Sequence, residues 1–277
     1  MAEIVAGFCL PHDPLMASTP EINEQPKADA VFAALDEVHR RIVDQKIDTV
    51  IVIGDDHYCK FGPHCLPQYL IGVGDVDGPE EPWLGIERYT VPNNVPLATH
   101  IMNYGFDHGF DWAVAKNITL DHGTMVPIHL AVKPSESKIR AIPIYIAAGV
   151  QPLLRTRRAF ELGQMIGNAV KASHGSDRVA IFGTGGISHW VGSAQMGRVN
   201  EEFDRMVLDK VSGGDVEALI ALSDEHVEET AGNGALEIRN WIMAMGAVGA
   251  IGAEVICYEP VPEWICGMGV AELKMAA

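Results

Sequence analysis

Positive charge is scarce in this sequence. Lys and Arg number 20 against 37 Asp and Glu, which leaves a formal net charge of −17 at pH 7. Such a field repels phosphate backbones and anionic lipid headgroups, so we expect neither nucleic acid nor a membrane as a partner. A small anionic substrate would need local positive charge from a metal, an Arg or a helix N-terminus.

Long apolar runs and paired cysteines are also lacking. The N-terminal stretch MAEIVAGFCLPHDP has no basic region, and its short apolar run ends at a Pro and a His, unlike a signal peptide. No apolar run reaches the roughly 18 residues needed to span a bilayer. The cysteines at positions 9, 59, 65, 257 and 266 form no CxxC pair. These features favour a reducing cytoplasm.

What is present is a regular alternation of strand-like and helix-like segments, with no linker or repeat, which predicts a single domain over residues 1–277. Apolar, β-branched runs predict buried strands at 3–10, 48–54, 139–146, 178–183 and 253–258. Helical patterns lie at 27–45, 96–106, 156–173, 198–211 and 234–250. The order predicts an α/β fold, a three-layer sandwich with a largely parallel central sheet.

The segment 59–93 is rich in Pro and Gly and is expected to be a long ordered excursion. Loops of that length are often functional. It begins with Cys59, His64 and Cys65, close behind His57. Four such residues crowded into one loop, without a distant second pair, do not match a closed structural zinc site.

Polar clusters follow the predicted strands. His12 and His57 each come directly after an apolar strand, and ligands of such folds bind beyond these strand ends. A neutral imidazole is a good ligand for a divalent metal, so the pair favours a metal site over two unrelated loop histidines. The adjacent Asp13 and Asp56 could orient the imidazoles or act as turn residues.

Glu237 lies about three residues into the helix expected from Gly234. A capping box or the helix dipole selects a Glu at that position, and so does metal ligation. Spacing alone leaves both interpretations open.

Two further histidines lie in turns. His189 follows the turn Gly-Thr-Gly-Gly at 183–186, which matches neither phosphate-loop pattern. A histidine there suits acid–base chemistry at neutral pH, and a structural turn histidine is the alternative. His122, in Leu-Asp-His-Gly, has the same two interpretations. No serine lies in a GxSxG motif.

Together these clusters resemble the class III extradiol ring-cleavage dioxygenases, the family of the protocatechuate 4,5-dioxygenase catalytic subunit. The resemblance runs from residue 4 to about 250, and five segments in the same order carry it: Pro11-His12, Asp55-Asp56-His57, Asp121-His122-Gly123 with Val126-Pro127, Gly183 to His189, and Gly234 to Glu237 with Trp241 following.

The resemblance implies that His12, His57 and Glu237 bind Fe(II), that His189 is the acid–base catalyst, and that His122 is a second active-site histidine near the substrate. The resemblance implies that the substrates are O₂ and a small aromatic compound. This compound would be a diol similar to the carboxylated catechols that the family cleaves, or a hydroxypyridone. We expect this chain to lack a counterpart of the family's accessory small domain, a part that a homodimer could supply. The alternatives are a non-oxidative interaction protein resembling the Memo-type proteins and a zinc hydrolase with the same ligands.

Overall fold

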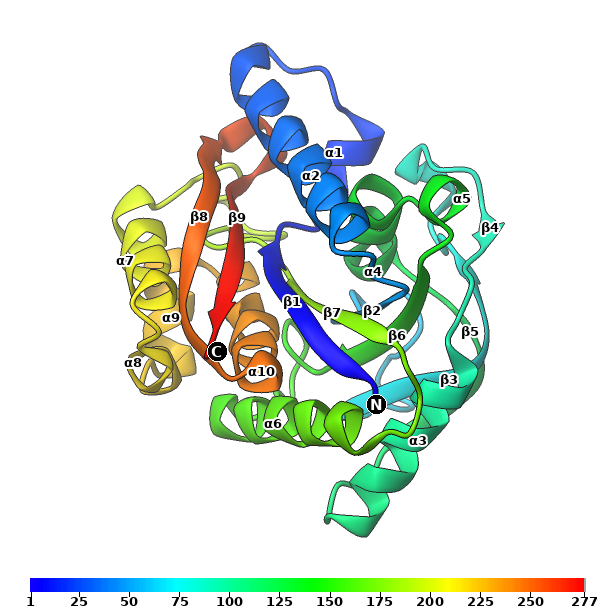
Figure 1. Cartoon of the computed structure of the whole chain (residues 1–277). Helices are drawn as coiled ribbons and strands as arrows, with labels where there is room; N and C mark the ends of the chain where they lie inside the picture. Colours follow the sequence, from blue (N-terminus) through cyan, green and yellow to red (C-terminus); the bar gives the residue numbers. More distant parts are fainter. Residues whose placement is uncertain (277) are drawn as a thin grey trace.

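The computed structural model describes residues 1–276, which form one nine-stranded mixed sheet between two layers of helices (Figure 1). The strands follow the order β4-β3-β6-β2-β7-β1-β9-β8, and β5 pairs with β3 outside this path. The strand bounds are β1 Glu3–Leu10, β2 Thr49–Gly54, β3 Tyr69–Gly78, β4 Tyr89–Thr90, β5 Ala113–Thr119, β6 Arg140–Ile146, β7 Arg178–Thr184, β8 Ala250–Val261 and β9 Cys266–Met275.

The centre of the sheet is parallel. Strands β6, β2, β7 and β1 run in the same direction, and their apolar sequences are buried along most of their length. Both flanks are antiparallel, since β3 pairs antiparallel with β6 and β9 with β1. The predicted α/β fold is therefore confirmed, with antiparallel flanks that the sequence pattern did not show.

The five predicted strands are all present, and the missed ones have weaker patterns. Strand β3 contains three glycines and β9 contains two, which interrupt the apolar runs, and β5 is half exposed. Because a glycine contributes no side chain to a strand face, neither β3 nor β9 reads as a strand from periodicity.

The five predicted helical segments are also present, and helices cover both faces of the sheet. Helices α3, α6 and α10 pack together on one face, and α2 packs with η2 on the other. None of the helices within residues 1–276 is long and apolar enough to cross a membrane. The helix bounds are α1 Leu15–Ser18, α2 Gln25–Asp44, η1 Pro82–Leu84, α3 Val95–Asp107, α4 His122–Pro127, η2 Ile128–Val132, α5 Pro134–Ser137, α6 Thr156–Ala172, α7 Glu201–Ser212, α8 Val216–Ile220, α9 Asp224–Ala231, η3 Gly234–Glu237, α10 Ile238–Val248 and η4 Pro262–Trp264.

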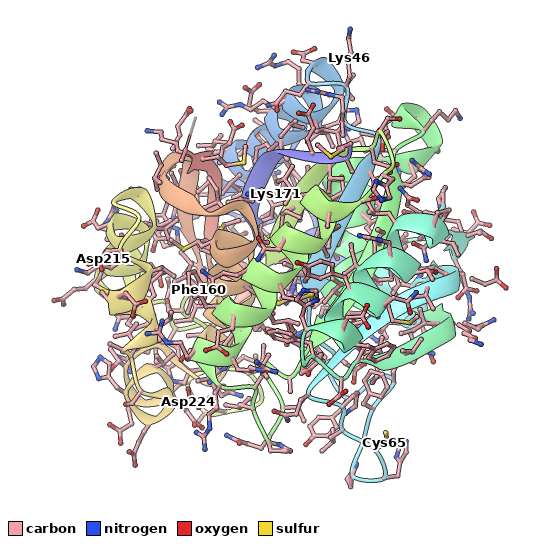
Figure 2. The ribbon with its side chains drawn as sticks, turned by 60° about the horizontal axis from the view of Figure 1, so that its bottom comes forward. Lys46, Cys65, Phe160, Lys171, Asp215 and Asp224 are labelled. Atoms are coloured by element: carbon pink, nitrogen blue, oxygen red, sulfur yellow. The ribbon has the colours of Figure 1, made fainter. Side chains whose placement is uncertain are left out.

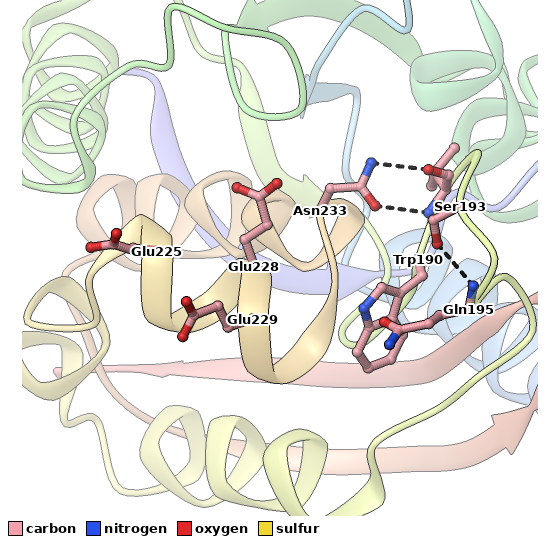
Figure 3. A pocket seen from close by; sticks show the side chains of 8 residues that line it. Trp190, Ser193, Gln195, Glu225, Glu228, Glu229 and Asn233 are labelled. Atoms are coloured by element: carbon pink, nitrogen blue, oxygen red, sulfur yellow. Dashed lines mark hydrogen bonds between the residues drawn. The ribbon is translucent and has the colours of Figure 1, made fainter.

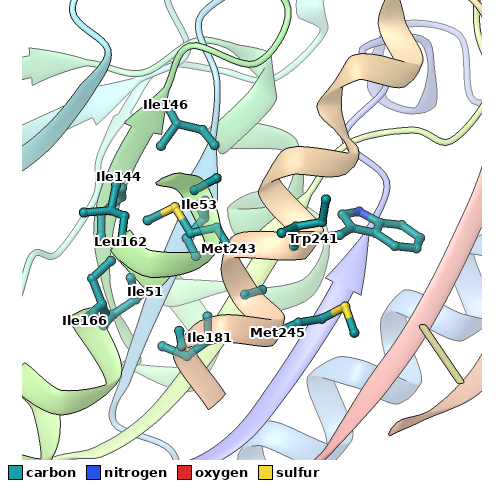
Figure 4. Packing of buried hydrophobic residues seen from close by; sticks show 14 of the residues in the cluster. Ile51, Ile53, Ile144, Ile146, Leu162, Ile166, Ile181, Trp241, Met243 and Met245 are labelled. Carbon is teal, nitrogen blue, oxygen red and sulfur yellow. The ribbon is translucent and has the colours of Figure 1, made fainter. Parts of the chain in front are cut away.

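One of the two apolar cores fills the space between the sheet and helices α6 and α10 (Figure 4). Ile53 and Ile181 of the sheet meet Leu162 of α6 and Met243 of α10 there, and all four side chains are fully buried. This packing fixes the start of α10, where Glu237 lies, against the ends of the central strands.

The segment 59–93 is only partly an excursion. From residue 69 onwards it joins the fold through β3, η1 and β4, whereas residues 59–68 form the loop that carries Cys65 outwards (Figure 2). The segment also returns to the strand ends at Glu81, which is buried.

Candidate metal centre and its cavity

Three side chains predicted to bind a metal meet beyond the carboxyl ends of β1 and β2. The Nε2 atom of His12 lies 3.1 Å from Oε2 of Glu237, and the Nε2 atom of His57 lies 3.2 Å from Oε1 of the same carboxylate. The histidines follow β1 and β2, which lie on either side of β7 in the parallel centre of the sheet, and η3 brings Glu237 to the same point. Residues 225 positions apart in the sequence thus form one cluster.

Hydrogen bonds fix which nitrogen of each imidazole faces the cluster. Nδ1 of His12 lies 3.0 Å from the Thr184 hydroxyl, which has carbonyl acceptors of its own, so Nδ1 is the donor to the hydroxyl oxygen. Nδ1 of His57 donates to Asp121 Oδ2 at 2.9 Å. With Nδ1 as the donor, each imidazole in its neutral form presents the Nε2 lone pair to the cluster, and this is the form in which imidazole binds a metal.

Glu237 does not act as a helix cap. Within the described chain its side chain forms no capping hydrogen bond, and Oε2 instead accepts from the backbone N–H of Gly186 at 3.2 Å. Burial opposes the charge on Glu237, but His12 and His189 outweigh it and hold the pKa of this carboxyl well below its usual value. The capping interpretation is thus not supported.

Asp55 is a fourth potential ligand that sequence reasoning did not single out. Its Oδ1 accepts from the Asn240 side chain at 2.9 Å, while Oδ2 is buried without a partner among residues 1–276 and lies 3.7 Å from His57 Nε2. Asp55, His57, His12 and Glu237 form a group whose potential ligand atoms all lie within 4.8 Å of one another. The Asp-Asp-His motif was the available signal.

The two acidic residues considered as orienting partners are turn residues. Asp13 accepts from the backbone N–H of Leu15, and Asp56 accepts from those of Lys60 and Phe61. Asp121, which the sequence offered only as the neighbour of His122, orients His57 instead.

His189 lies at the same cluster. Its Nε2 is 3.7 Å from Glu237 Oε2, and its ring packs so closely on Gly234 that a Cβ there would come within 2.1 Å of Nε2. Burial opposes protonation of His189, yet Cys266 and Glu237 raise its pKa well above the usual value. A buried imidazole at this place can hold or give a proton beside the metal ligands.

His122 lies beside His57 and lines the same cavity. Its ring lies 4.0 Å from that of His57, centroid to centroid, and its Nδ1 is 2.6 Å from Glu81 Oε1. No sequence pattern pointed to Glu81. Cys59, expected to be one of a crowded group of loop thiols and histidines, lies 3.3 Å from the same Glu81 oxygen.

A cavity of about 160 Å³ opens at this point. Its volume is close to the roughly 150 Å³ that holds one benzene molecule in a protein interior. The described lining contains no Lys or Arg, and it comprises His12, Asp13, Pro14, His57, His122, Gly186, His189, Val191, Glu237, Ile265 and Cys266. The metal cluster thus borders a space for a single aromatic ring.

The family described as the catalytic LigB subunit of aromatic ring-opening dioxygenase matches residues 6–269. The chain belongs to this family. The match confirms the resemblance to the extradiol dioxygenases that the strand-end motifs indicated.

Several curated proteins are similar to this chain over nearly its whole length. It is 28% identical to a 2,3-dihydroxyphenylpropionate/2,3-dihydroxicinnamic acid 1,2-dioxygenase of Rhodococcus sp, with 96% of this chain and 97% of the relative covered. The enzyme of the same name from Photorhabdus laumondii is 27% identical, with 96% of each chain covered. An uncharacterised protein from Escherichia coli K12 has the same fold, with a TM-score of 0.59 at 11% identity over 97% of this chain and 99% of that one.

The donor set of this ring-opening dioxygenase family member fits a divalent metal. Two ligand atoms at right angles, each about 2.1 Å from one ion, lie about 3.0 Å apart. The observed separations of 3.1 and 3.2 Å match this spacing. His12 Nε2 is also buried with no hydrogen-bond partner among the described residues, as expected of an atom whose partner is a metal.

A second, more open hollow adjoins the cavity at Val191 (Figure 3). Asn233 holds this stretch by two hydrogen bonds to the Val191 backbone. Glu225, Glu228 and Glu229 line the hollow, so the surroundings of the cavity are acidic.

Proposed function

We propose that this protein is a ferrous-iron extradiol dioxygenase that opens the ring of a catechol-type substrate with O₂, and that His12, His57 and Glu237 hold the iron. The observation that carries the proposal is the convergence of two Nε2 lone pairs and one carboxylate beside a cavity of one-ring size. Bound ferrous iron would leave positions for a diol and O₂ and could pass electrons between them, which zinc cannot.

The protein's own groups would manage the protons. His189 would take a proton from one substrate hydroxyl and return it later, since its Nε2 borders the cavity beside Glu237. His122, which also lines the cavity, would accept a hydrogen bond from the substrate. The apolar wall of Pro14, Val191 and Ile265 would orient the ring and exclude water.

The substrate is proposed as a compound with two neighbouring oxygens on an electron-rich ring: a catechol, carboxylated as for the relatives named above, or a hydroxypyridone. Bidentate chelation requires both oxygens, so analogues with one hydroxyl should not react. We also propose that the protein is cytoplasmic and a homo-oligomer, a dimer in the simplest case, whose second copy would cover the cavity near the exposed Val191.

The test is O₂ uptake by anaerobically purified protein loaded with Fe(II). Catechol, protocatechuate, 2,3-dihydroxyphenylpropionate and a 3-hydroxy-4-pyridone are added before air is admitted, and the absorbance of ring-opened products is followed. We expect turnover of at least one diol or hydroxypyridone and none of the matching monophenols.

Zinc-loaded protein is the control. Hydrolysis of ester substrates by the zinc form, with no O₂ uptake by the iron form, would replace the proposal with the hydrolase alternative. Silence of the iron-loaded protein across the panel would favour a non-enzymatic interaction protein.

A further inference from the structure

Glu81 is a buried carboxylate outside the metal cluster that the proposed chemistry does not yet use. Glu81 is 5% exposed and belongs to the 59–93 segment, where it immediately precedes η1. Its Oε1 accepts hydrogen bonds from Nδ1 of His122 at 2.6 Å and from the His122 backbone N–H at 3.2 Å. The Cys59 thiol is a third donor at 3.3 Å.

Burying the Glu81 carboxylate costs free energy that its contacts must offset. A buried carboxylate loses hydration, and Glu81 Oε2 has no hydrogen-bond partner among residues 1–276. No Lys or Arg lies among the contacts described for Glu81. Hydrogen bonds from the His122 imidazole and the Cys59 thiol stabilise its carboxylate instead. The short contact to His122 is the main compensation.

That contact decides the state of the His122 ring. A proton on Nδ1 is held by Glu81, and this leaves the lone pair of Nε2 facing the cavity that His122 lines. The backbone bond adds a second constraint, because the same oxygen holds both the ring and the start of α4. The neighbouring His57 ring, 4.0 Å away, has the same relation to Asp121.

We propose that Glu81 is a positioning residue that keeps His122 in the Nδ1–H tautomer, so that His122 presents a hydrogen-bond acceptor to a substrate hydroxyl. The proposal rests on the proposed function for its consequence in turnover, but not for the tautomer itself. It also gives the 59–93 segment a role: it delivers the carboxylate to the active-site side of the sheet.

The tautomer can be measured without activity. Metal-free protein labelled with ¹⁵N-histidine is examined by long-range ¹H–¹⁵N correlation near neutral pH, and the His122 signals are assigned by their loss in His122→Gln. We expect a protonated Nδ1 and an unprotonated Nε2 in the wild type, and a mixture or the reverse in Glu81→Gln. A wild-type His122 protonated on Nε2 alone would overturn the proposal whatever the enzyme does.

Kinetics of the iron-loaded enzyme test the consequence, with Glu80→Gln as the matched control. Glu80 is the preceding residue, undergoes the same change of charge, and pairs with Lys60 at 2.7 Å instead of contacting His122. We expect Glu81→Gln to retain its iron and to lose kcat by roughly tenfold to a hundredfold, with a smaller change in KM, and Glu80→Gln to match the wild type.

The outcomes separate a positioning role from a purely structural one. Equal kcat in Glu81→Gln and Glu80→Gln would overturn the proposal. If Glu81→Gln does not fold, Glu81→Asp is used, which keeps the acceptor but shortens its reach. Partial kcat with the wild-type tautomer in that variant would support the proposal, and full kcat with a reversed tautomer would overturn it. An inactive wild type with the expected tautomer would refute the proposed function alone.

Discussion

The histidines around the cavity differ mainly in the partner of the second ring nitrogen. Thr184 holds Nδ1 of His12, Asp121 holds that of His57, and Nδ1 of His189 lies 3.3 Å from the backbone oxygen of Ile187. In each case the remaining nitrogen is directed to the cavity. The residue that contacts Nδ1 therefore orients each imidazole toward the cavity.

Glu237 provides the test of the metal centre at this scale. Glu237→Ala should abolish tight Fe(II) binding, because it removes the carboxylate that both Nε2 atoms face. Asp55→Asn should retain iron more weakly, since Asp55 lies 3.7 Å from His57 and is held by Asn240. Metal content after dialysis against Fe(II) is the measurement. Full iron in Glu237→Ala, or loss only in Asp55→Asn, would show that the ligand set is wrong.

His189 should affect the reaction and not the metal. The His189→Gln variant should keep its iron, because in the wild type the Nε2 atom of His189 is farther from Glu237 than the Nε2 atoms of His12 and His57 are. We expect kcat to fall by about 10²–10⁴-fold, the range of a lost general acid–base group, with a smaller effect on KM. Loss of iron from this variant would make His189 a ligand, and unchanged kcat would make it structural.

At the scale of elements, the position of Glu237 depends on how α10 packs on α6. Gly163 and Gly167 of α6 allow the two backbones to approach so closely that a Cβ at Gly163 would lie 2.0 Å from the Met243 carbonyl oxygen, and one at Gly167 2.2 Å from that of Ala247. Backbone cannot move aside as a side chain can. The spacing of the helices is therefore fixed by these two glycines.

Gly163→Ala should lower the free energy of unfolding by about 1–3 kcal/mol, the usual cost of overpacking. This holds although alanine is the better helix former by about 1 kcal/mol. Gly213→Ala is the control, because Gly213 is exposed, has φ −81° and would bring its Cβ no nearer than 3.3 Å to a neighbour. Urea unfolding of both variants is compared, and equal stability would show that α6 and α10 move apart freely.

At the scale of the whole molecule, the charge of −17 surrounds a cavity whose described lining has no Lys or Arg. The adjoining hollow adds three glutamates. An anionic diol must approach against this field, whereas a neutral diol does not.

Salt should therefore distinguish the two kinds of substrate. We expect KM for protocatechuate to fall severalfold between low salt and about 0.5 M NaCl, where repulsion is screened, and KM for catechol to change little. Steady-state O₂ uptake at several salt concentrations measures both. A KM for protocatechuate that rises with salt would point to a cationic group outside the residues that line the cavity here.

Much of the site could be predicted because its residues follow the strongest patterns in the chain. His12 and His57 end buried strands, and a parallel sheet places such ends at one edge whatever the loops do. Glu237 and His189 lie in short motifs whose order resembles the family, and the geometry brings all of these residues together.

The partners of these residues could not be predicted, since each comes from a distant segment with an ordinary local sequence. Glu81 lies in a Pro-rich stretch, and Asp13 and Asp56 look as suitable in sequence as Asp121 does. Only the folded chain decides which carboxylate faces an imidazole and which caps a turn.

By itself, then, the sequence determined the parallel α/β core and the positions of the metal-binding candidates, because hydrophobic periodicity and strand ends are local properties. The tertiary structure decided which group contacts each imidazole, the hydrogen bonding of Glu237, the path of the 59–93 segment and the size of the cavity. These depend on contacts between residues up to 225 positions apart, whose energies arise from burial and hydrogen-bond geometry that no local pattern encodes.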